Sequence, residues 1–375
     1  MLIDEQNILP EDTEVWEYIL TNIRKGSMIP VISNSLRLGH LFREELRQSK
    51  GKAGSQKSNN NIFTIDKILT EKWAKEIQYP LQDKHNLARV AQYWQVENPN
   101  QYRSAKEQYL DSLKKFFLDE VEMTLSHPDG KHQDVPLVKE EVENLRRKVN
   151  FYNFSELVVD QLSYPRFSQG IEDPLRLLAK LDLPFFITTS HFDFLERVIR
   201  SESGGKKEPR IQVCFCKPNF NARSEHALDH DLTPDIKNPV VYHIYGLEDY
   251  PESLILSEDD YLNFLISMFE NKDMLHPLIP SKLRKALATS PLLLLGFQLH
   301  DWDFRVLFRF LLKFRQPGAK PGLIIQLNPG KKGTEPKDRS VEFLNNYFGK
   351  EAFNLFWEDA DSFIQKLYRT WSSNR

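Results

Sequence analysis

Polar side chains gather in four short segments, each of which follows an apolar run of the chain. The segments are residues 33–36, 188–193, 243–247 and 296–305. Two of them contain His191 and His243, and imidazole is the side chain that most readily exchanges a proton near neutral pH. Ser33, Asn34 and Ser35 form another, where backbone N–H groups at the start of a helix can hold a phosphate. These residue types permit acid–base chemistry beside a bound phosphate group.

The elements that must position these segments alternate along the chain. Apolar runs predict strands at residues 28–32, 183–189, 211–215, 240–244, 292–295, 323–327 and 352–357. Helical periodicity predicts helices at residues 12–24, 192–199, 258–270, 302–315 and 338–348. Such alternation indicates an α/β, Rossmann-like fold with a mostly parallel sheet flanked by helices. Because ligands bind beyond the carboxyl ends of parallel strands, we expect the four polar segments to meet there.

The strand pattern is interrupted once. Residues 63–180 show helical stripes and no convincing strand, which predicts a large helical insertion after the first strand. Residues 49–62 are polar and rich in lysine, serine and asparagine, as is typical of a mobile loop. We therefore expect a single domain over 1–375, with a Rossmann-like core made of residues 1–48 and 183–375.

Composition narrows the function classes. The chain has 375 residues, a net charge of −3 and a hydrophobic fraction of 40%, which suits a sizeable core but not an electrostatic nucleic-acid binder. No apolar run is long enough to span a membrane and no secretory signal is visible, so we expect a cytoplasmic protein. Two cysteines exclude a disulfide framework. Cys214 and Cys216 with His226 and His230 form only a weak zinc pattern, and we predict no metal site.

Several stretches together resemble a bacterial sirtuin-like domain, of the branch found in antiphage defence. The stretches are residues 86–93, 186–196, 241–246, 251–261 and 293–308. The resemblance implies a Rossmann-like fold that binds NAD+ and cleaves it to nicotinamide and ADP-ribose, so that NAD+ depletion halts the infected cell. It implies no cofactor beyond NAD+ as the substrate. The expected partners are further copies of the chain, a sensor or regulatory protein from the same operon, or both, without direct contact to nucleic acid or membrane.

Three motifs depart from the family pattern. Ser33 and Ser35 stand where the family has glycines of its phosphate loop, and the alternative for this segment is a helix cap without a ligand. Ser190 replaces an asparagine at the water and ribose site. Tyr245 replaces the histidine that ends a strand. These departures leave open a second interpretation, a catalytically degenerate subunit that binds a nucleotide or serves as a scaffold.

The sequence therefore leaves open which residue acts as the general base. His243 precedes Tyr245 by two residues, so a continuous strand would put both on one face, about 6–7 Å apart. Either His243 acts as the base, or Tyr245 positions the substrate, or base catalysis is lost; a buried core histidine is the alternative for His243. His191 is a possible proton acceptor or a surface or capping residue. The predicted catalytic group is Ser190, His191, His243 and Tyr245.

The remaining polar positions are assigned to nucleotide binding. They are Ser33, Asn34, Ser35, Thr188, Thr189, Asp193, Gly246, Gly296, Phe297, Gln298 and Asn328. Asp193 is expected either to orient a ribose or to cap the helix that follows. The apolar residues that come next in the fourth segment, Trp302, Phe304, Leu307 and Phe308, are expected in the core.

Overall fold

The structure is a computed structural model. It describes residues 10–41, 65–101, 104–126, 138–165, 172–215, 233–270, 279–299, 301–326, 337–350 and 353–373. Asn328, Cys216, His226, His230 and the predicted loop 49–62 lie outside these ranges.

One sheet of seven parallel strands organises the described part of the chain. Its strands are β1 (Ile29–Ile32), β2 (Phe185–Thr188), β3 (Arg210–Val213), β4 (Val240–His243), β5 (Leu292–Leu295), β6 (Gly322–Gln326) and β7 (Phe353–Trp357). Their order is β3-β4-β2-β1-β5-β6-β7, and every neighbouring pair is parallel. The predicted α/β, Rossmann-like class is confirmed, and each predicted strand is present with bounds that differ by at most a few residues.

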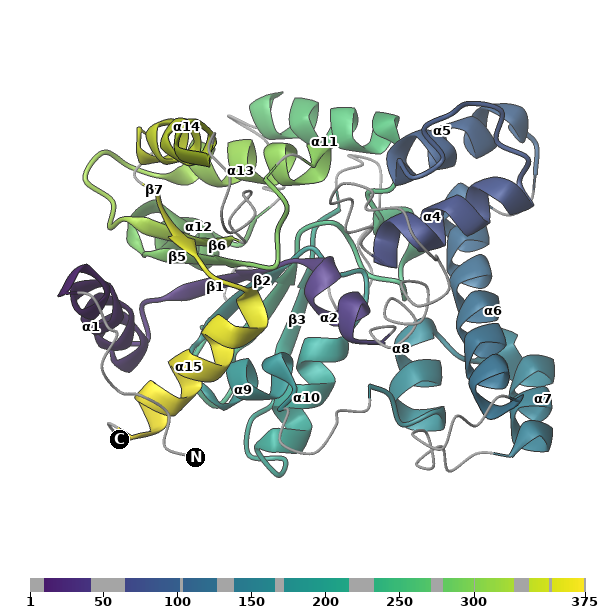
Figure 1. Cartoon of the computed structure of the whole chain (residues 1–375), viewed down its shortest axis with the longest axis horizontal. Coiled ribbons are helices and arrows are strands. Elements are labelled where there is room, and N and C mark those ends of the chain that lie inside the picture. Colours follow the sequence, from purple (N-terminus) through teal and green to yellow (C-terminus); the bar gives the residue numbers. More distant parts are fainter. Residues whose placement is uncertain are drawn as a thin grey trace.

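Helices cover both faces of this sheet (Figure 1). On one face lie α1 (Pro10–Arg24), α9 (Pro174–Lys180), α10 (Phe194–Glu202) and α15 (Ala360–Ser373). On the other lie α11 (Glu258–Glu270), α12 (Ser281–Thr289), α13 (Trp302–Phe314) and α14 (Lys337–Gly349). β5 shows why both faces need cover, because Leu292 and Leu294 enter one core while Leu293 and Leu295 enter the other.

The described chain between β1 and β2 contains helices and no strand. It forms α2 (Asn34–Leu41), α4 (Ile65–Glu76), α5 (Leu87–Glu97), α6 (Ala105–Ser126), α7 (Lys139–Lys148), α8 (Phe154–Glu156) and α9, with a 3-10 helix at Val149–Phe151 and a π-helix at Leu157–Gln161. Most of these helices stand to one side of the sheet in Figure 1. α9 differs, because it packs against α10 and α15 and so belongs to the layer that covers the sheet.

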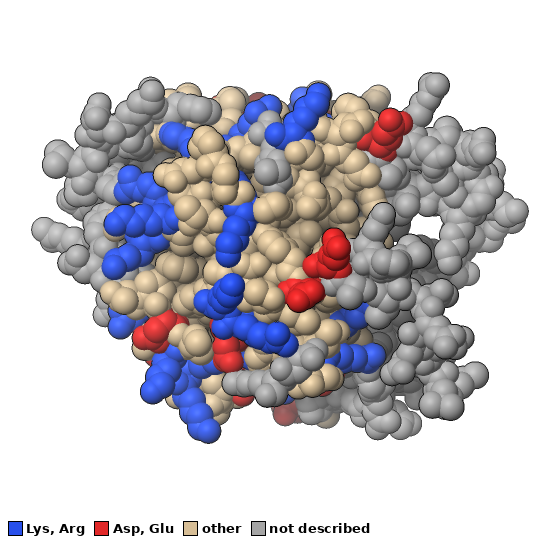
Figure 2. All heavy atoms as spheres, turned by 90° about the vertical axis from the view of Figure 1, so that its left-hand side faces the viewer, with Lys and Arg blue, Asp and Glu red and all other residues tan. Residues whose placement is uncertain are grey.

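Basic side chains gather on one face of the described structure. Among the residues coloured in Figure 2, Lys and Arg outnumber Asp and Glu, although the whole chain has a net charge of −3. Lys282, Arg284 and Lys285 of α12 are exposed. Within the described ranges, no helix combines the length and apolar character that crossing a membrane requires.

Candidate functional site

The order of the strands reverses at β1, which is flanked by β2 and β5. The segments that follow β1 and β5 come together at the carboxyl edge of the sheet. Gly296 has a φ of +78°, and a Cβ there would lie 3.1 Å from Cβ of Leu36 and 3.4 Å from Cβ of Ser33. Both the backbone conformation and the close approach of the two loops therefore require glycine at position 296.

The serine loop after β1 is a helix cap. Ser33 Oγ accepts from the backbone N–H of Ser35 at 3.2 Å, and the Ser33 carbonyl accepts from Leu36 N–H at 3.2 Å. The N–H of Asn34 donates to Thr189 Oγ1 at 3.0 Å. These three N–H groups already have acceptors in the protein, so a phosphate would have to displace them.

The segment after β2 is fixed by its own hydroxyl groups. Thr188 Oγ1 accepts from Ser190 N–H at 2.9 Å and donates to the Ile32 carbonyl at 3.3 Å. Ser190 Oγ accepts from Phe192 N–H at 3.1 Å and lies 3.2 Å from the Phe192 carbonyl. The Ser190 hydroxyl thus holds a turn that presents the next residue, His191.

His191 is the candidate histidine whose ring forms no hydrogen bond in the described structure. It is 5% exposed, and neither ring nitrogen has a hydrogen-bond partner in the described part of the chain. Burial, followed by the charges of His243 and Lys106, lowers its pKa to about 4. Asp260 opposes that shift, as does the Ile255 backbone, which approaches the ring without hydrogen-bond geometry. At neutral pH the imidazole is therefore uncharged, with a lone pair available.

His243, by contrast, has a hydrogen-bond partner at each ring nitrogen. Its Nδ1–H donates to the Ser190 carbonyl at 2.8 Å, and its Nε2 lies 2.6 Å from Oε1 of Glu196 on α10. Both side chains are 0% exposed. Burial acts to lower the pKa of His243, but the charge and hydrogen bond of Glu196 outweigh it, so the pKa is raised. Two acceptors on one ring favour the imidazolium form, paired with the Glu196 carboxylate.

Tyr245 lies on the other side of the sheet from His243, so the expectation of a shared face is wrong. β4 ends at His243, and the turn that follows breaks the strand alternation. The Tyr245 ring packs against Tyr261 and Phe264 of α11, and its hydroxyl donates to the Asp303 carbonyl at 2.6 Å. The two side chains therefore cannot stand in for one another at a single reacting centre.

Gly246 serves a contact within the protein. Its φ is +88°, and a Cβ there would lie 2.3 Å from the Ser253 carbonyl oxygen in the turn Pro251–Ser253. Phe297 packs in the core, where its ring centroid lies 5.4 Å from that of Phe304. The Gln298 carbonyl accepts a hydrogen bond from Asp301 N–H at 3.0 Å.

Asp193 precedes α10 and makes no side-chain cap bond. Instead its carboxylate accepts from Arg197 Nε at 2.7 Å. Cys214 is a buried free thiol, and no group of three potential metal ligands occurs among the residues that can be described.

Buried polar atoms without hydrogen-bond partners concentrate at this edge. In the described structure five of them are Asn34 Oδ1, Arg37 Nε, both ring nitrogens of His191 and Glu196 Oε2. They belong to α2, to the segment after β2 and to α10. Native proteins leave few such atoms unsatisfied, and a cluster of them marks a place where a ligand or ordered water supplies the missing partners.

Several residues of the site were not found by sequence reasoning. Glu248 is buried, and it accepts from the N–H groups of Phe154 and Ser155 at 2.6 and 2.9 Å. Burial raises its pKa to about 7, although these hydrogen bonds act in the opposite direction. Lys106 of α6 donates to the Leu254 carbonyl and to Asp260 Oδ1, which ties the helical part to the segment after β4.

No local pattern could have linked these residues. Glu196 and His243 are 47 residues apart in the sequence, and Lys106 and Asp260 are 154 apart. Arg37, whose guanidinium pairs with the Asp173 carboxylate in the interior, is likewise invisible to spacing. Only the fold brings them together.

Comparison with known families adds an independent finding. Residues 184–349 match the family model of the SIR2-like domain. The matched stretch runs from the start of β2 to the end of α14 and includes the segments after β2, β4 and β5. No curated protein sequence matches the chain.

Proposed function

Since residues 184–349 match a SIR2-like domain, which supports a sirtuin-like NAD-binding protein, we propose that this chain binds NAD+ at the carboxyl edge of β1, β2 and β4 and hydrolyses its nicotinamide–ribose bond. The observation that carries the proposal is the cluster of buried, unpartnered polar atoms around Asn34 and His191. A nucleotide with hydroxyl, amide and phosphate groups can supply partners for such atoms.

To hydrolyse this bond, the protein must orient the substrate and supply one hydrogen-bond acceptor for the attacking water. When the bond breaks, its electron pair moves to the pyridinium nitrogen, and neutral nicotinamide leaves from the ribose C1′. Water attacks the oxocarbenium-like centre and gives up a proton, which yields ADP-ribose. The uncharged ring of His191 accepts the hydrogen bond that orients this water, and Ser190 holds the turn that presents the ring.

We further propose a biological role for this reaction. Sustained cleavage depletes NAD+, and in our proposal this halts an infected cell as part of antiphage defence. An enzyme of that kind must stay inactive until infection, so we propose control by a sensor or regulatory partner, with or without assembly into oligomers.

A second candidate is a nucleotide-binding subunit that does not cleave NAD+. It is favoured because the other predicted catalytic groups already form hydrogen bonds within the protein. Both nitrogens of His243, the hydroxyl of Tyr245 and the hydroxyl of Ser190 are already engaged within the protein.

The test is to incubate the purified chain with NAD+, alone and with proteins encoded beside it, and to follow nicotinamide and ADP-ribose. We expect equal amounts of both products and a loss of at least tenfold in His191→Ala. Binding of NAD+ without any nicotinamide release, with every partner, would favour the second candidate. Release that requires an acylated lysine peptide would instead identify a deacylase.

A further inference from the structure

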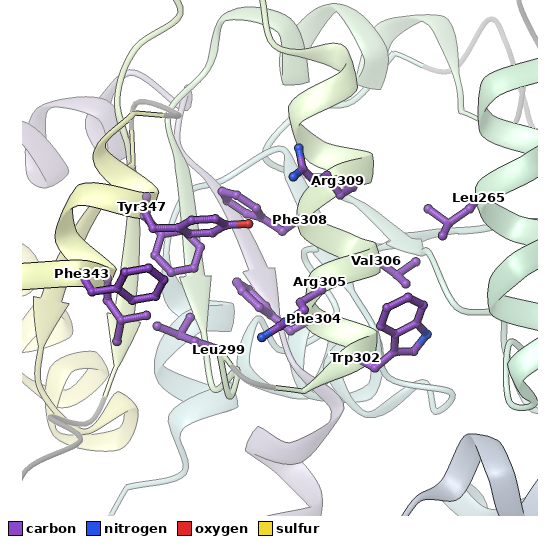
Figure 3. A pocket seen from close by; sticks show the side chains of 12 residues that line it. Leu265, Leu299, Trp302, Phe304, Arg305, Val306, Phe308, Arg309, Phe343 and Tyr347 are labelled. Atoms are coloured by element: carbon purple, nitrogen blue, oxygen red, sulfur yellow. The ribbon is translucent and has the colours of Figure 1, made fainter. Parts of the chain in front are cut away.

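A groove opens on the surface between α13 and α14, with one wall from α11. Its volume is about 440 Å³. Figure 3 shows aromatic side chains of α13 and α14 facing one another across it. The residues that line it are Leu265, Leu299, Trp302, Phe304, Arg305, Val306, Phe308, Arg309, Phe343, Leu344, Tyr347 and Phe348.

The groove exposes three large apolar or aromatic side chains. Trp302 is 52% exposed, Phe343 is 64% exposed and Tyr347 is 43% exposed. The sequence predicts Trp302, Phe304, Leu307 and Phe308 in the core. The last three are buried, but Trp302, the first residue of α13, is not. A contiguous exposed apolar surface of this kind is typical of a docking site.

The charges of the groove have one sign. Arg305 and Arg309 are exposed and lie four residues apart, so they share one side of α13. Neither forms an ion pair with any residue that the structure describes. The nearest carboxylates along these helices, Asp303 and Glu342, do not line the groove. The groove thus offers two guanidinium groups, one helical turn apart, beside an apolar floor.

These features point to the chemistry of the occupant. A second copy that docked through the same face would bring like charges together without any carboxylate in the groove to offset them. We propose that the groove binds an amphipathic helix of a partner protein, with apolar side chains at helical spacing and acidic side chains flanking them. Its carboxylates meet Arg305 and Arg309, and its apolar side chains cover Trp302 and Phe343.

The groove adjoins the candidate NAD+ site through the core. Phe304 in the groove packs against Phe297 of the segment after β5, with ring centroids 5.4 Å apart. The Asp303 carbonyl accepts the hydroxyl of Tyr245 at 2.6 Å. A helix docked here therefore lies on elements that shape the site, but its binding does not depend on whether NAD+ is cleaved.

The test uses a labelled 18-residue helical peptide with leucines along one side and glutamates flanking them, together with the same peptide carrying lysine for every glutamate. Fluorescence anisotropy measures the binding of each to the full chain at low salt. We expect the glutamate peptide to bind at least tenfold more tightly. We expect Phe343→Ser to weaken it at least tenfold, and the double variant Arg305→Glu/Arg309→Glu to reverse the preference toward the lysine peptide.

The matched control is Lys282→Glu/Lys285→Glu, which alters two exposed charges of α12 and should leave both affinities unchanged. Equal binding of the two peptides, or an equal loss in this control, would overturn the proposal. It would also be overturned if sedimentation of the chain alone showed a dimer that Phe343→Ser dissociates, because the occupant would then be a second copy.

Discussion

At the scale of single residues, His191 and His243 show how surroundings give two histidines opposite states. His191 is buried without hydrogen-bond partners in the described structure, which costs free energy unless a ligand supplies them. His243 is buried between two acceptors and carries a raised pKa. The first is suited to receive a ligand or water. The second is suited to hold the Ser190 carbonyl, and so to position His191.

The state of His191 predicts an unusual pH profile for nicotinamide release. Because its pKa is about 4, the ring stays neutral as the pH falls through 5.5, with His243, Lys106 and Asp260 as the charged groups around it. We expect the rate at pH 5.5 to match that at pH 7.5. A histidine of ordinary pKa would retain only about a tenth of its neutral form at pH 5.5. A tenfold loss of kcat in protein that circular dichroism shows to be folded would contradict this role.

Glu196 predicts a large effect on stability. Glu196→Gln removes the carboxylate that balances the buried imidazolium of His243 and leaves that charge without its counter-ion. We expect the free energy of unfolding to fall by about 3 kcal/mol, since breaking a buried pair is costly. The control is Glu208→Gln, whose 64% exposed carboxylate pairs with Arg200, and here the loss should stay below about 1 kcal/mol. Equal losses in urea denaturation would show that the buried pair adds nothing.

At the scale of elements, the sequence predicts what depends on local pattern. The run at β5 is fully apolar and is buried on both faces, and the acidic start of α11 marks the beginning of that helix. The sequence does not predict where an element ends when a tertiary contact ends it. β4 stops at His243 because the next residues turn to bring Gly246 against Ser253, and this moved Tyr245 to the opposite side. Helical spacing predicts Trp302 in the core because spacing does not show which side of α13 has a partner.

Glu248 joins two elements in a way that depends on pH. It caps the start of α8 from the segment after β4, and its pKa is raised from 4.5 to about 7 by burial. A carboxyl whose folded pKa is raised stabilises the protein fully below its unfolded pKa, and this contribution is lost as the pH rises through the folded value. Between pH 4.5 and 7 the loss is at most about 3 kcal/mol.

We therefore expect Glu248→Gln to gain stability relative to the wild type as the pH rises from 4.5 to 7. The comparison is made at each pH by urea denaturation, so that the titrations of His191 and His243 cancel. The control is Glu252→Gln, which removes an exposed carboxylate of the same segment. A constant difference between Glu248→Gln and the wild type would mean that Glu248 does not titrate in this range.

At the scale of the whole molecule, the parallel sheet explains why polar segments far apart in sequence meet. All seven strands run the same way, so the segments after β1, β2, β4 and β5 share one edge. That convergence was predictable from the alternation of strands and helices. The contacts that α6 and α8 make to the segment after β4, through Lys106 and Glu248, were not, because they depend on how the helical part folds back.

Calorimetric titration with ADP-ribose tests whether this edge binds NAD+. ADP-ribose keeps the pyrophosphate and both riboses of NAD+ and has no nicotinamide bond left to cleave. We predict saturable binding to one site of the wild-type chain. Asn34→Ala, which removes a buried unpartnered amide oxygen, should weaken binding at least tenfold, while Asn263→Ala on the exposed side of α11 should not. No binding to the folded wild type, or equal affinities for all three proteins, would show that NAD+ does not bind at this edge as proposed.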